Sequence, residues 1–378
     1  IQRVTIPGQG IMAVTEYDWL VAKKVVYPGG ATHEFTTDDR YRLTGILVKD
    51  PAGNPLMDYK YHRDEVGIIT RKETEHGNYI FGYDEEYQLT SVASPSGSET
   101  YSYDSAGNRT LTSQSQIEWL YSPNHELLSR PEYSYDYDSN GSMIRKTKNG
   151  QNTYYSYNGN NRLTEIKDNN NQTIAKYQYD PYGRRISKEV SGTKTYYFYS
   201  PQGLIGEYTE TGELIRGYGY FPGAAWTTDP LYLKTAQDNY YYYLNDENGT
   251  PIKLVTGSGA VVWDAEYDAF GRVKIKKEQI KSPLRFAGQY EDEETGLHYN
   301  LTRYYDPDIG RYITSDSLGM LAGINTYTYA AGNPIMFSDP NGEIATVLVG
   351  AGVGAIIGGI AGGFSAWWNG KSPWDIAK

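Results

Sequence analysis

Two hydrophobic patterns divide the chain, and they change over near residue 343. Before that point, apolar and aromatic positions alternate with polar ones in short stretches that are interrupted by Gly, Asn and Asp. Such alternation is typical of β-strands with one buried face, joined by tight turns. From Ile344 to Gly370 no side chain is charged. The pattern therefore predicts a long series of strands followed by an apolar segment of a different kind.

The alternating stretches recur about every twenty residues, and each ends in Tyr-Asp or a close variant followed by a turn. In YSYDSAGNRTLT, Tyr101 and Tyr103 fall on one face of a strand, and DSAGN suits a turn before alternation resumes. Two short strands and two turns account for each unit, which therefore fits one β-hairpin. A hairpin is not stable alone, so we expect the units to stack edge to edge. The repeat tyrosines are Tyr61, Tyr83, Tyr103, Tyr121, Tyr137, Tyr157, Tyr179 and Tyr199.

The composition also favours an all-β fold. The 378 residues include 39 Tyr and 41 Gly but only 8 Phe. Tyr favours strands and can bury its ring while its hydroxyl stays hydrogen-bonded, and Gly serves the turns. An ordinary sandwich of Tyr-rich strands is the alternative, but the regular period favours stacked hairpins.

Charge and cysteine content exclude several classes of function. The formal net charge is −11 and Lys and Arg form no cluster, which argues against a nucleic-acid partner. The absence of Cys excludes disulfides and thiolate metal sites, and the 5 His show no metal-ligand spacing. We therefore expect neither a metal nor another cofactor. The chain begins Ile-Gln-Arg-Val without an initiator Met or a signal peptide, so we expect a piece of a longer protein.

A long motif near the end resembles a known family. Residues 282–319 are SPLRFAGQYEDEETGLHYNLTRYYDPDIGRYITSDSLG, and residues 322–342 are AGINTYTYAAGNPIMFSDPNG. Together with the Tyr-Asp repeat they resemble RHS-type YD-repeat proteins and their RHS-repeat-associated core domain, over residues 40–342. The resemblance is to the C-terminal part of such proteins, as in polymorphic toxins and the C components of Tc toxins. It implies hairpins that wind into a spiral β-shell, which the core domain closes as a plug.

The resemblance and the hydrophobic pattern together suggest three parts. We expect a YD-repeat shell segment over residues 1–239, the core domain over residues 240–342, and the start of a C-terminal cargo region over residues 343–378. The last part is a short apolar tail that could be helical. We expect these hairpins to form only part of a shell, with the missing N-terminal chain or a partner subunit supplying the rest.

In the family, the core domain carries two Asp-Pro-x-Gly motifs whose aspartates act as an aspartyl protease on their own chain. The matching stretches are Asp316-Ser317-Leu318-Gly319 and Asp339-Pro340-Asn341-Gly342. Two adjacent carboxylates cannot both ionise easily, so one keeps a proton for the scissile carbonyl while the other activates water. The resemblance implies a cut between Glu343 and Ile344, with the released piece kept inside the shell. Arg311, shortly before Asp316, is a candidate to stabilise one ionised carboxylate.

Each aspartate also has a structural interpretation, because Asp before Pro or Ser and Gly is a common turn former. Two departures from the family count against catalysis: Ser317 replaces Pro, and Glu343 replaces Leu directly before the expected cut. Glu343 changes the fit there and adds a third carboxylate. An alternative is therefore a shell that never cuts and keeps its tail tethered. Between the two motifs, NTYTY (325–329) predicts a strand that lets the chain return.

The apolar segment after the expected cut is long enough to span a membrane. Residues 344–364 provide roughly the twenty apolar residues that a spanning helix needs. On a helix, Gly at every fourth position forms one stripe of the kind that lets membrane helices pack, and the following Trp pair suits an interface. Insertion into a membrane, packing inside the shell and a flexible linker all stay open. The insertion candidates are Gly350, Gly354, Gly358, Gly362, Trp367 and Trp368.

The sequence thus predicts a secreted bacterial shell that encloses and delivers its own C-terminal toxin, freed by one intramolecular cut. As an enzyme it would be a single-turnover aspartyl autoprotease. The expected partners are the toxin segment, the remaining shell or a partner shell subunit, a type VI or Tc secretion apparatus, and a target membrane. The export route is not encoded in this chain. The alternative is a teneurin-like YD-shell for adhesion or glycan binding, but the core motif directly before an apolar tail favours the toxin.

Overall fold

The computed structural model describes residues 3–18 and 21–343. Within them, regular structure is β-strand except for two short 3-10 helices, η1 (Gly319–Leu321) and η2 (Ala330–Gly332). The strands pair antiparallel in three sheets. The predicted all-β fold of YD-repeat hairpins is confirmed.

Two long sheets form the wall of the molecule. The first has 11 strands: β1 (Arg3–Ile6), β2 (Gly10–Asp18), β3 (Val21–Val26), β4 (Thr32–Thr37), β5 (Leu43–Lys49), β6 (Pro55–Arg63), β7 (Ile69–Thr74), β8 (Gly77–Tyr83), β9 (Leu89–Ser94), β10 (Gly97–Tyr103) and β11 (Arg109–Thr112). The second has 16 strands: β12 (Leu120–Tyr121), β13 (Leu127–Arg130), β14 (Tyr133–Tyr137), β15 (Met143–Lys148), β16 (Gln151–Tyr157), β17 (Leu163–Lys167), β18 (Thr173–Tyr179), β19 (Arg185–Val190), β20 (Thr193–Ser200), β21 (Gly203–Thr209), β22 (Leu214–Tyr220), β23 (Pro230–Thr235), β24 (Tyr240–Asn245), β25 (Pro251–Val255), β26 (Val261–Tyr267) and β27 (Val273–Glu278). Strand order follows chain order, as expected of stacked repeats.

The repeat tyrosines connect successive hairpins. Seven wall tyrosines at the ends of strands donate their hydroxyls to backbone carbonyls of the preceding hairpin, at 2.6 to 2.8 Å. The pairs are Tyr83–Ile69, Tyr103–Leu89, Tyr121–Arg109, Tyr157–Met143, Tyr179–Leu163, Tyr199–Arg185 and Tyr220–Leu204. One side chain thus adds apolar surface to the core and a hydrogen bond to the preceding repeat, which explains why this position selects Tyr over Phe.

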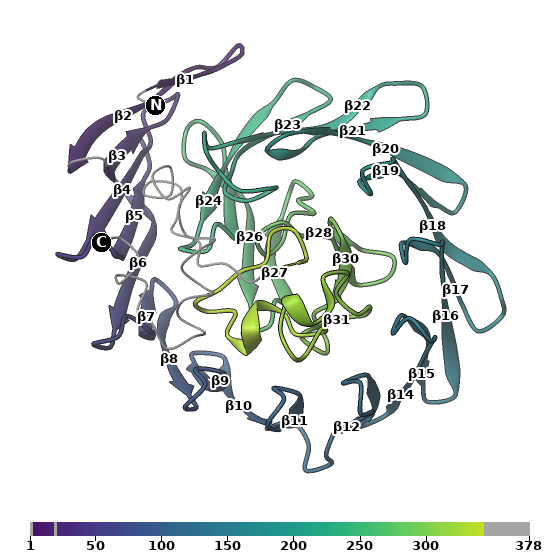
Figure 1. Ribbon diagram of the computed structural model, residues 1–378. Coiled ribbons are helices and arrows are strands. Elements are labelled where there is room, and N and C mark those ends of the chain that lie inside the picture. Colours follow the sequence, from purple (N-terminus) through teal and green to yellow (C-terminus); the bar gives the residue numbers. More distant parts are fainter. Residues whose placement is uncertain (1–2, 19–20, 344–378) are drawn as a thin grey trace.

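Seen end-on, the wall curves round into a ring whose last strands return to its first (Figure 1). Lys253 Nζ on β25 donates to Leu56 O on β6 at 2.9 Å, and Tyr79 on β8 donates to Glu266 Oε1 on β26 at 3.2 Å. One apolar core spans both parts of the wall, from Ile6 through to Phe270. We call this contact between β3–β9 and β23–β27 the seam.

A smaller unit, the plug (residues 282–343), lies inside the ring (Figure 1). Its sheet consists of β28 (Tyr290–Asp292), β29 (Leu297–Asn300), β30 (Arg303–Asp306) and β31 (Arg311–Tyr312). The plug is locked to the wall by Arg185, which is fully buried and pairs with Asp292 at 2.5 Å. The rings of Tyr177 and Tyr299 lie 5.2 and 4.4 Å from its guanidinium carbon. The buried cation is stabilised by an aromatic ring of the wall together with an aromatic ring and a carboxylate of the plug. Wall and plug therefore share one core.

Two details differ from the sequence predictions. The expected boundary between residues 239 and 240 falls within a continuous sheet, because Lys234 pairs with Tyr240 across β23 and β24. The wall therefore runs on to Glu278. The stretch 325–329 is not a strand but a series of turns with one bridge, between Thr328 and Arg311. Besides this bridge it contacts the plug sheet through single hydrogen bonds, such as the one from the N–H of Tyr312 to Tyr327 O at 3.0 Å, because turns interrupt it on both sides.

Candidate functional site

The two Asp motifs of the plug meet around a single arginine. Arg303 Nη2, on β30, lies 2.8 Å from Asp316 Oδ2 and 3.3 Å from Asp339 Oδ2. The three residues are 5%, 5% and 2% exposed, so water screens their charges little. The structure thus brings together the two aspartates that the sequence singled out.

Each aspartate uses one oxygen for a turn and the other for the site. Asp316 Oδ1 accepts the N–H of Leu318 at 2.8 Å, and Asp339 Oδ1 accepts the N–H of Glu343 at 2.9 Å. Both Oδ2 atoms face Arg303 instead. The turn at Asp316 survives the replacement of Pro by Ser317, because its hydrogen bonds run to neighbouring backbone N–H groups. The structural interpretation and the site are therefore compatible.

Neighbouring strands of the plug fix the position of Asp339. The hydroxyl of Tyr312, on β31, donates to Asp339 Oδ2 at 2.8 Å, and the Arg303 guanidinium stacks over the Tyr312 ring at 3.6 Å. Asn300 Nδ2, on β29, donates to Asp339 O at 2.7 Å. None of these three partners was selected from the sequence, although all lie within the family motif. Their signal was weak because plain strand residues carry no local mark of which face they occupy.

Arg311 lies on the opposite side of β31 from the site. Its guanidinium donates to Asn108 Oδ1 at 2.9 Å and to His125 O at 2.6 Å, both on wall turns. Successive side chains of a strand point to opposite faces, and Tyr312 faces Asp339. Arg311 therefore ties the plug to the wall. The guanidinium that contacts both carboxylates belongs to Arg303, which corrects the sequence prediction.

The backbone before the expected cut is held tightly. Gly342 O accepts hydrogen bonds from Arg303 Nε and from Thr302 Oγ1, both at 2.6 Å. Gly342 has φ +68°, and a Cβ there would lie 2.5 Å from Asn300 O. Only Gly fits this conformation and this space. The chain therefore arrives at Glu343 in one fixed path.

The surroundings of the site raise the pKa of Asp316. Burial raises the pKa of Asp316, the charges of Asp339 and Glu343 raise it further, and Arg303 opposes the shift. Burial and the charge of Asp339 raise the pKa of Tyr312 far above its usual value, so this hydroxyl keeps its proton and donates. A carboxyl group with a raised pKa, placed beside a second carboxyl group and a donating hydroxyl, is an arrangement that aspartyl catalysis uses.

Among the described residues, no group of three or more His, Cys, Asp or Glu is placed to hold a metal ion. No helix of the described part is long and apolar enough to cross a membrane. The remaining predicted residues lie outside the described ones: Ile344, Gly350, Gly354, Gly358, Gly362, Trp367 and Trp368.

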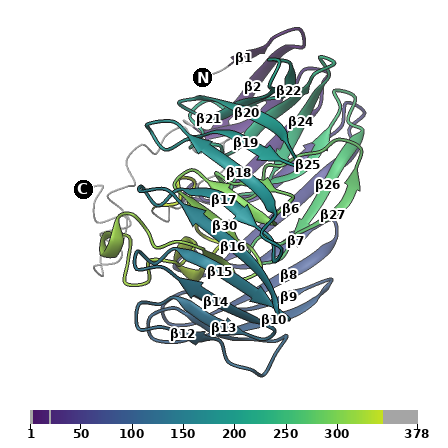
Figure 2. The same ribbon diagram turned by 90° about the vertical axis from the view of Figure 1, so that its right-hand side faces the viewer.

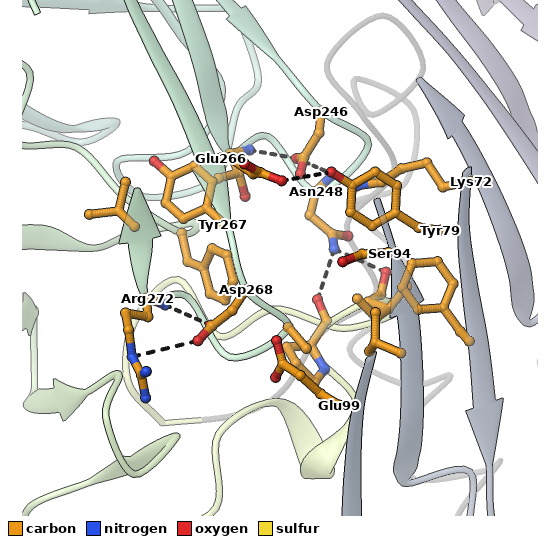
Figure 3. A pocket seen from close by; sticks show the side chains of 18 of the residues that line it. Lys72, Tyr79, Ser94, Glu99, Asp246, Asn248, Glu266, Tyr267, Asp268 and Arg272 are labelled. Atoms are coloured by element: carbon orange, nitrogen blue, oxygen red, sulfur yellow. Dashed lines mark hydrogen bonds and ion pairs between the residues drawn. The ribbon is translucent and has the colours of Figure 1, made fainter. Parts of the chain in front are cut away.

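A second cluster of acidic residues lines a cavity of about 260 Å³ at the seam (Figure 3). Its charged lining consists of Glu99, Asp246, Glu247, Glu266 and Asp268 with Lys72, Arg272 and Lys274. Burial and the charge of Glu247 raise the pKa of Asp246 to about 7, and burial raises the pKa of Asp268 to about 6. Both aspartates already cap their own turns: Asp246 Oδ1 accepts the N–H of Thr250 at 2.9 Å, and Asp268 Oδ1 that of Arg272 at 2.8 Å. Because Tyr79 on β8 donates to Glu266 on β26 across this cavity, we assign the cluster to closure of the wall.

Comparison with known proteins places these features in context. The family model described as Teneurin YD-shell matches residues 57–335. "Double-stranded DNA deaminase toxin A" of Burkholderia cenocepacia is 30% identical over 336 residues, which cover 79% of this chain and 23% of that protein. "Toxin protein Tse5" of Pseudomonas aeruginosa is 40% identical over 108 residues, or 29% of this chain and 8% of that protein. The chain thus spans less than a quarter of the length of these relatives.

A solved structure shares the architecture. The Photorhabdus luminescens Tc holotoxin pore superposes with a TM-score of 0.71 over 91% of this chain and 20% of the matched chain. The two sequences are 20% identical. At this identity the likeness establishes the fold alone.

Proposed function

This chain belongs to the Teneurin YD-shell family, and on that premise we propose that it is the shell-forming part of a secreted bacterial toxin. Its role would be to enclose and deliver the polypeptide that follows Glu343. Two observations support this: two relatives, 30% and 40% identical, are toxins by name, and the wall closes around the plug that precedes the C-terminal segment.

We propose further that the plug cuts its own chain once, between Glu343 and Ile344. The observation that carries this proposal is the pair of buried aspartates on Arg303, because one of them, Asp339, also binds the N–H of Glu343. A pair of carboxyl groups needs neither thiol nor metal to hydrolyse a peptide.

The geometry and charges suggest a role for each carboxyl group. Asp339 would act as the base that takes a proton from water, whose oxygen then bonds to the carbonyl carbon of Glu343. Asp316, whose pKa is raised, would hydrogen-bond the carbonyl oxygen and hold its proton. The C–N bond to Ile344 then breaks, the new amine takes up the proton, and Glu343 keeps the new carboxylate. Arg303 would stabilise negative charge throughout.

Intact-mass spectrometry under denaturing conditions tests the cut. We expect the parent to yield a fragment that ends at Glu343, and Asp339→Asn and Asp316→Asn to remain whole. Asn preserves such turns, since Asn158 Oδ1 in the wall accepts the N–H groups of Asn160 and Arg162 at 3.0 Å each. The matched control is Asp180→Asn, the same change in a wall turn, which should cut like the parent.

Each other outcome has a definite meaning. A parent that stays whole would mean that residues 316–343 have a structural role only and keep the C-terminal tail tethered. A cut that persists in both Asn variants would assign the cleavage to another protease. A cut lost also in Asp180→Asn would trace it to folding of the shell rather than to the site.

A further inference from the structure

An exposed apolar loop stands next to the site. We call residues 317–325, which follow Asp316, the apolar loop. Its side chains Met320, Leu321 and Ile324 are 82%, 88% and 62% exposed, and Leu321 is the most exposed large apolar side chain of the described residues. Contact of apolar area with water is unfavourable by about 25 cal/mol per Å², and clustered exposure of this kind marks an interaction surface.

The base of the apolar loop is firmly held. Thr326 O accepts hydrogen bonds from Arg303 Nη1 at 2.8 Å and from the backbone N–H of Asp316 at 3.1 Å. Asn325 Nδ2 donates to Asn108 Oδ1 on a wall turn at 2.8 Å. The exposed tip is therefore presented from a fixed base, at the end of the ring where loops of the plug reach beyond the wall (Figure 2).

We propose that the apolar loop is the docking surface for residues 344–349, the first part of the segment that leaves the plug. The path of the chain carries this assignment. Arg303 contacts both ends of the apolar loop, at Asp316 and Thr326, and also binds Gly342 O. The segment therefore begins beside the base of the loop, with only Glu343 between.

The chemistry of the segment fits the surface. Residues 344–349 are Ile-Ala-Thr-Val-Leu-Val, with no charged side chain. Six extended residues reach about 20 Å, enough to lie along a short loop. Docking would remove apolar groups of both partners from water without desolvating a charge.

This inference deepens the proposed function without depending on it. A docked segment would fix the direction of the chain beyond Glu343 and so hold its carbonyl toward the two carboxyl groups. Met320 and Leu321 would then be positioning residues on the leaving side of the cut. In a chain that never cuts, the same contact would tether the tail.

Disulfide cross-linking tests the contact directly, because the chain contains no Cys. Leu321→Cys is combined with Val347→Cys in the Asp339→Asn background, which retains the segment in either case. The control pair is Tyr182→Cys with Val347→Cys, since Tyr182 is 82% exposed on a wall turn. After mild oxidation, peptide mass spectrometry should show an intramolecular 321–347 disulfide that forms at least tenfold faster than the 182–347 disulfide.

Equal rates for the two pairs, repeated with Met320→Cys and Leu348→Cys, would overturn the proposal. A disulfide between two molecules would assign the surface to a second copy instead, and would overturn it equally. In a parent that cuts, Met320→Ser with Leu321→Ser should slow the cut about tenfold and leave the thermal midpoint unchanged. No cut in the parent together with a 321–347 disulfide in the double-Cys variant refutes self-cleavage alone, whereas a cut in the parent without that disulfide in the variant refutes docking alone.

Discussion

The pattern Asp-Pro-x-Gly occurs in both regions of the molecule, in the wall at 50–53 and 180–183 and in the plug at 339–342. Its local geometry is the same: the glycines have φ of +91°, +80° and +68°, and each Asp Oδ1 accepts the N–H four residues on, at 2.8 to 2.9 Å. The regions differ at the other carboxylate oxygen. In the wall it binds a side chain four residues on, whereas in the plug it binds Tyr312 and Arg303 from other strands.

The comparison shows that the turn and the partners of the second carboxylate oxygen are separate properties of one motif. Partial burial raises the pKa of Asp180, but hydrogen bonds from the N–H and guanidinium of Arg184 outweigh it and hold that pKa below its usual value. In the plug, burial raises the pKa of Asp316, which belongs to the related turn Asp-Ser-Leu-Gly. The residue four positions after Asp339 is Glu343, an acid that cannot neutralise it, so the carboxylate meets partners from distant strands.

Replacing Arg303 with Met should produce the largest difference between the two regions. Its loss leaves two buried carboxylates without their shared cation, which costs about 3–5 kcal/mol. Arg184→Met removes the same guanidinium from a wall pair whose Arg is 33% exposed, and should cost no more than about 1 kcal/mol. Hydrogen exchange of peptides spanning 316–326 and 180–190 measures both effects. Equal losses of protection in the two variants would contradict the difference between plug and wall.

Gly342→Ala should lower the free energy of unfolding more than Gly183→Ala, although both glycines have positive φ. An Ala in this conformation loses about 1–2 kcal/mol at either site. At Gly342 the new Cβ also meets the backbone oxygen of Asn300, which adds about 1–3 kcal/mol, whereas at Gly183 it meets the guanidinium of Arg162, a side-chain end that can shift more easily than backbone. Thermal unfolding midpoints test this ranking, and a reversed order would show that the plug turn relaxes more easily than the wall turn.

Lowering the pH from 8 to 5 should strengthen the seam. The folded pKa of Asp246 is raised to about 7 by burial and by Glu247, against Lys72, so the folded chain binds a proton that the unfolded chain lacks. The contribution of Asp246 to stability should therefore rise as the pH falls from about 7 toward 4, by on the order of 1–3 kcal/mol. It is measured as the difference between parent and Asp246→Asn, because burial lowers the pKa of His33 and His298 to about 3 and their contribution falls over the same range. Asp246→Asn, which keeps the turn acceptor, should flatten this dependence of the unfolding midpoint. A dependence that stays unchanged would refute the assignment.

The wall turn at Asp180 should show the opposite sign. Its pKa is lowered in the folded state, so the stability it contributes is present above the usual carboxyl pKa and is lost as the pH falls below it. The difference in midpoint between parent and Asp180→Asn should therefore shrink on acidification. A difference that grows would remove the contrast between the two turns.

Tyr157→Phe should have the smallest effect, about 1 kcal/mol. The change removes one hydrogen bond between hairpins, from the hydroxyl to Met143 O at 2.8 Å, and keeps the buried ring. Tyr182→Phe, at an exposed turn, is the control and should leave the midpoint unchanged. Both variants should process their chains like the parent, and a loss of processing in Tyr157→Phe would couple the wall to the plug.

Much of the fold followed from local signals. Alternating Tyr positions and Asp-Gly turns predicted hairpins in series, because strand alternation and turn chemistry act within a few residues. The spacing did not show that the strands from Tyr240 to Glu278 continue the wall, since these strands lack the regular repeat. Nor did the sequence show that residues 325–329 form no strand, because strand formation depends on whether the edge of another strand is close enough to pair with them.

By itself the sequence determined the β-hairpin repeat, the turn at each Asp-x-x-Gly and, through its family motif, the pair Asp316 and Asp339. Only the tertiary structure decided that Arg303 rather than Arg311 joins them, and that Tyr312 and Asn300 hold Asp339. The physical reason is that a turn is closed by neighbours in the chain. The charge state of a buried carboxyl group is set by whatever strands fold against it, and those strands come from far along the sequence.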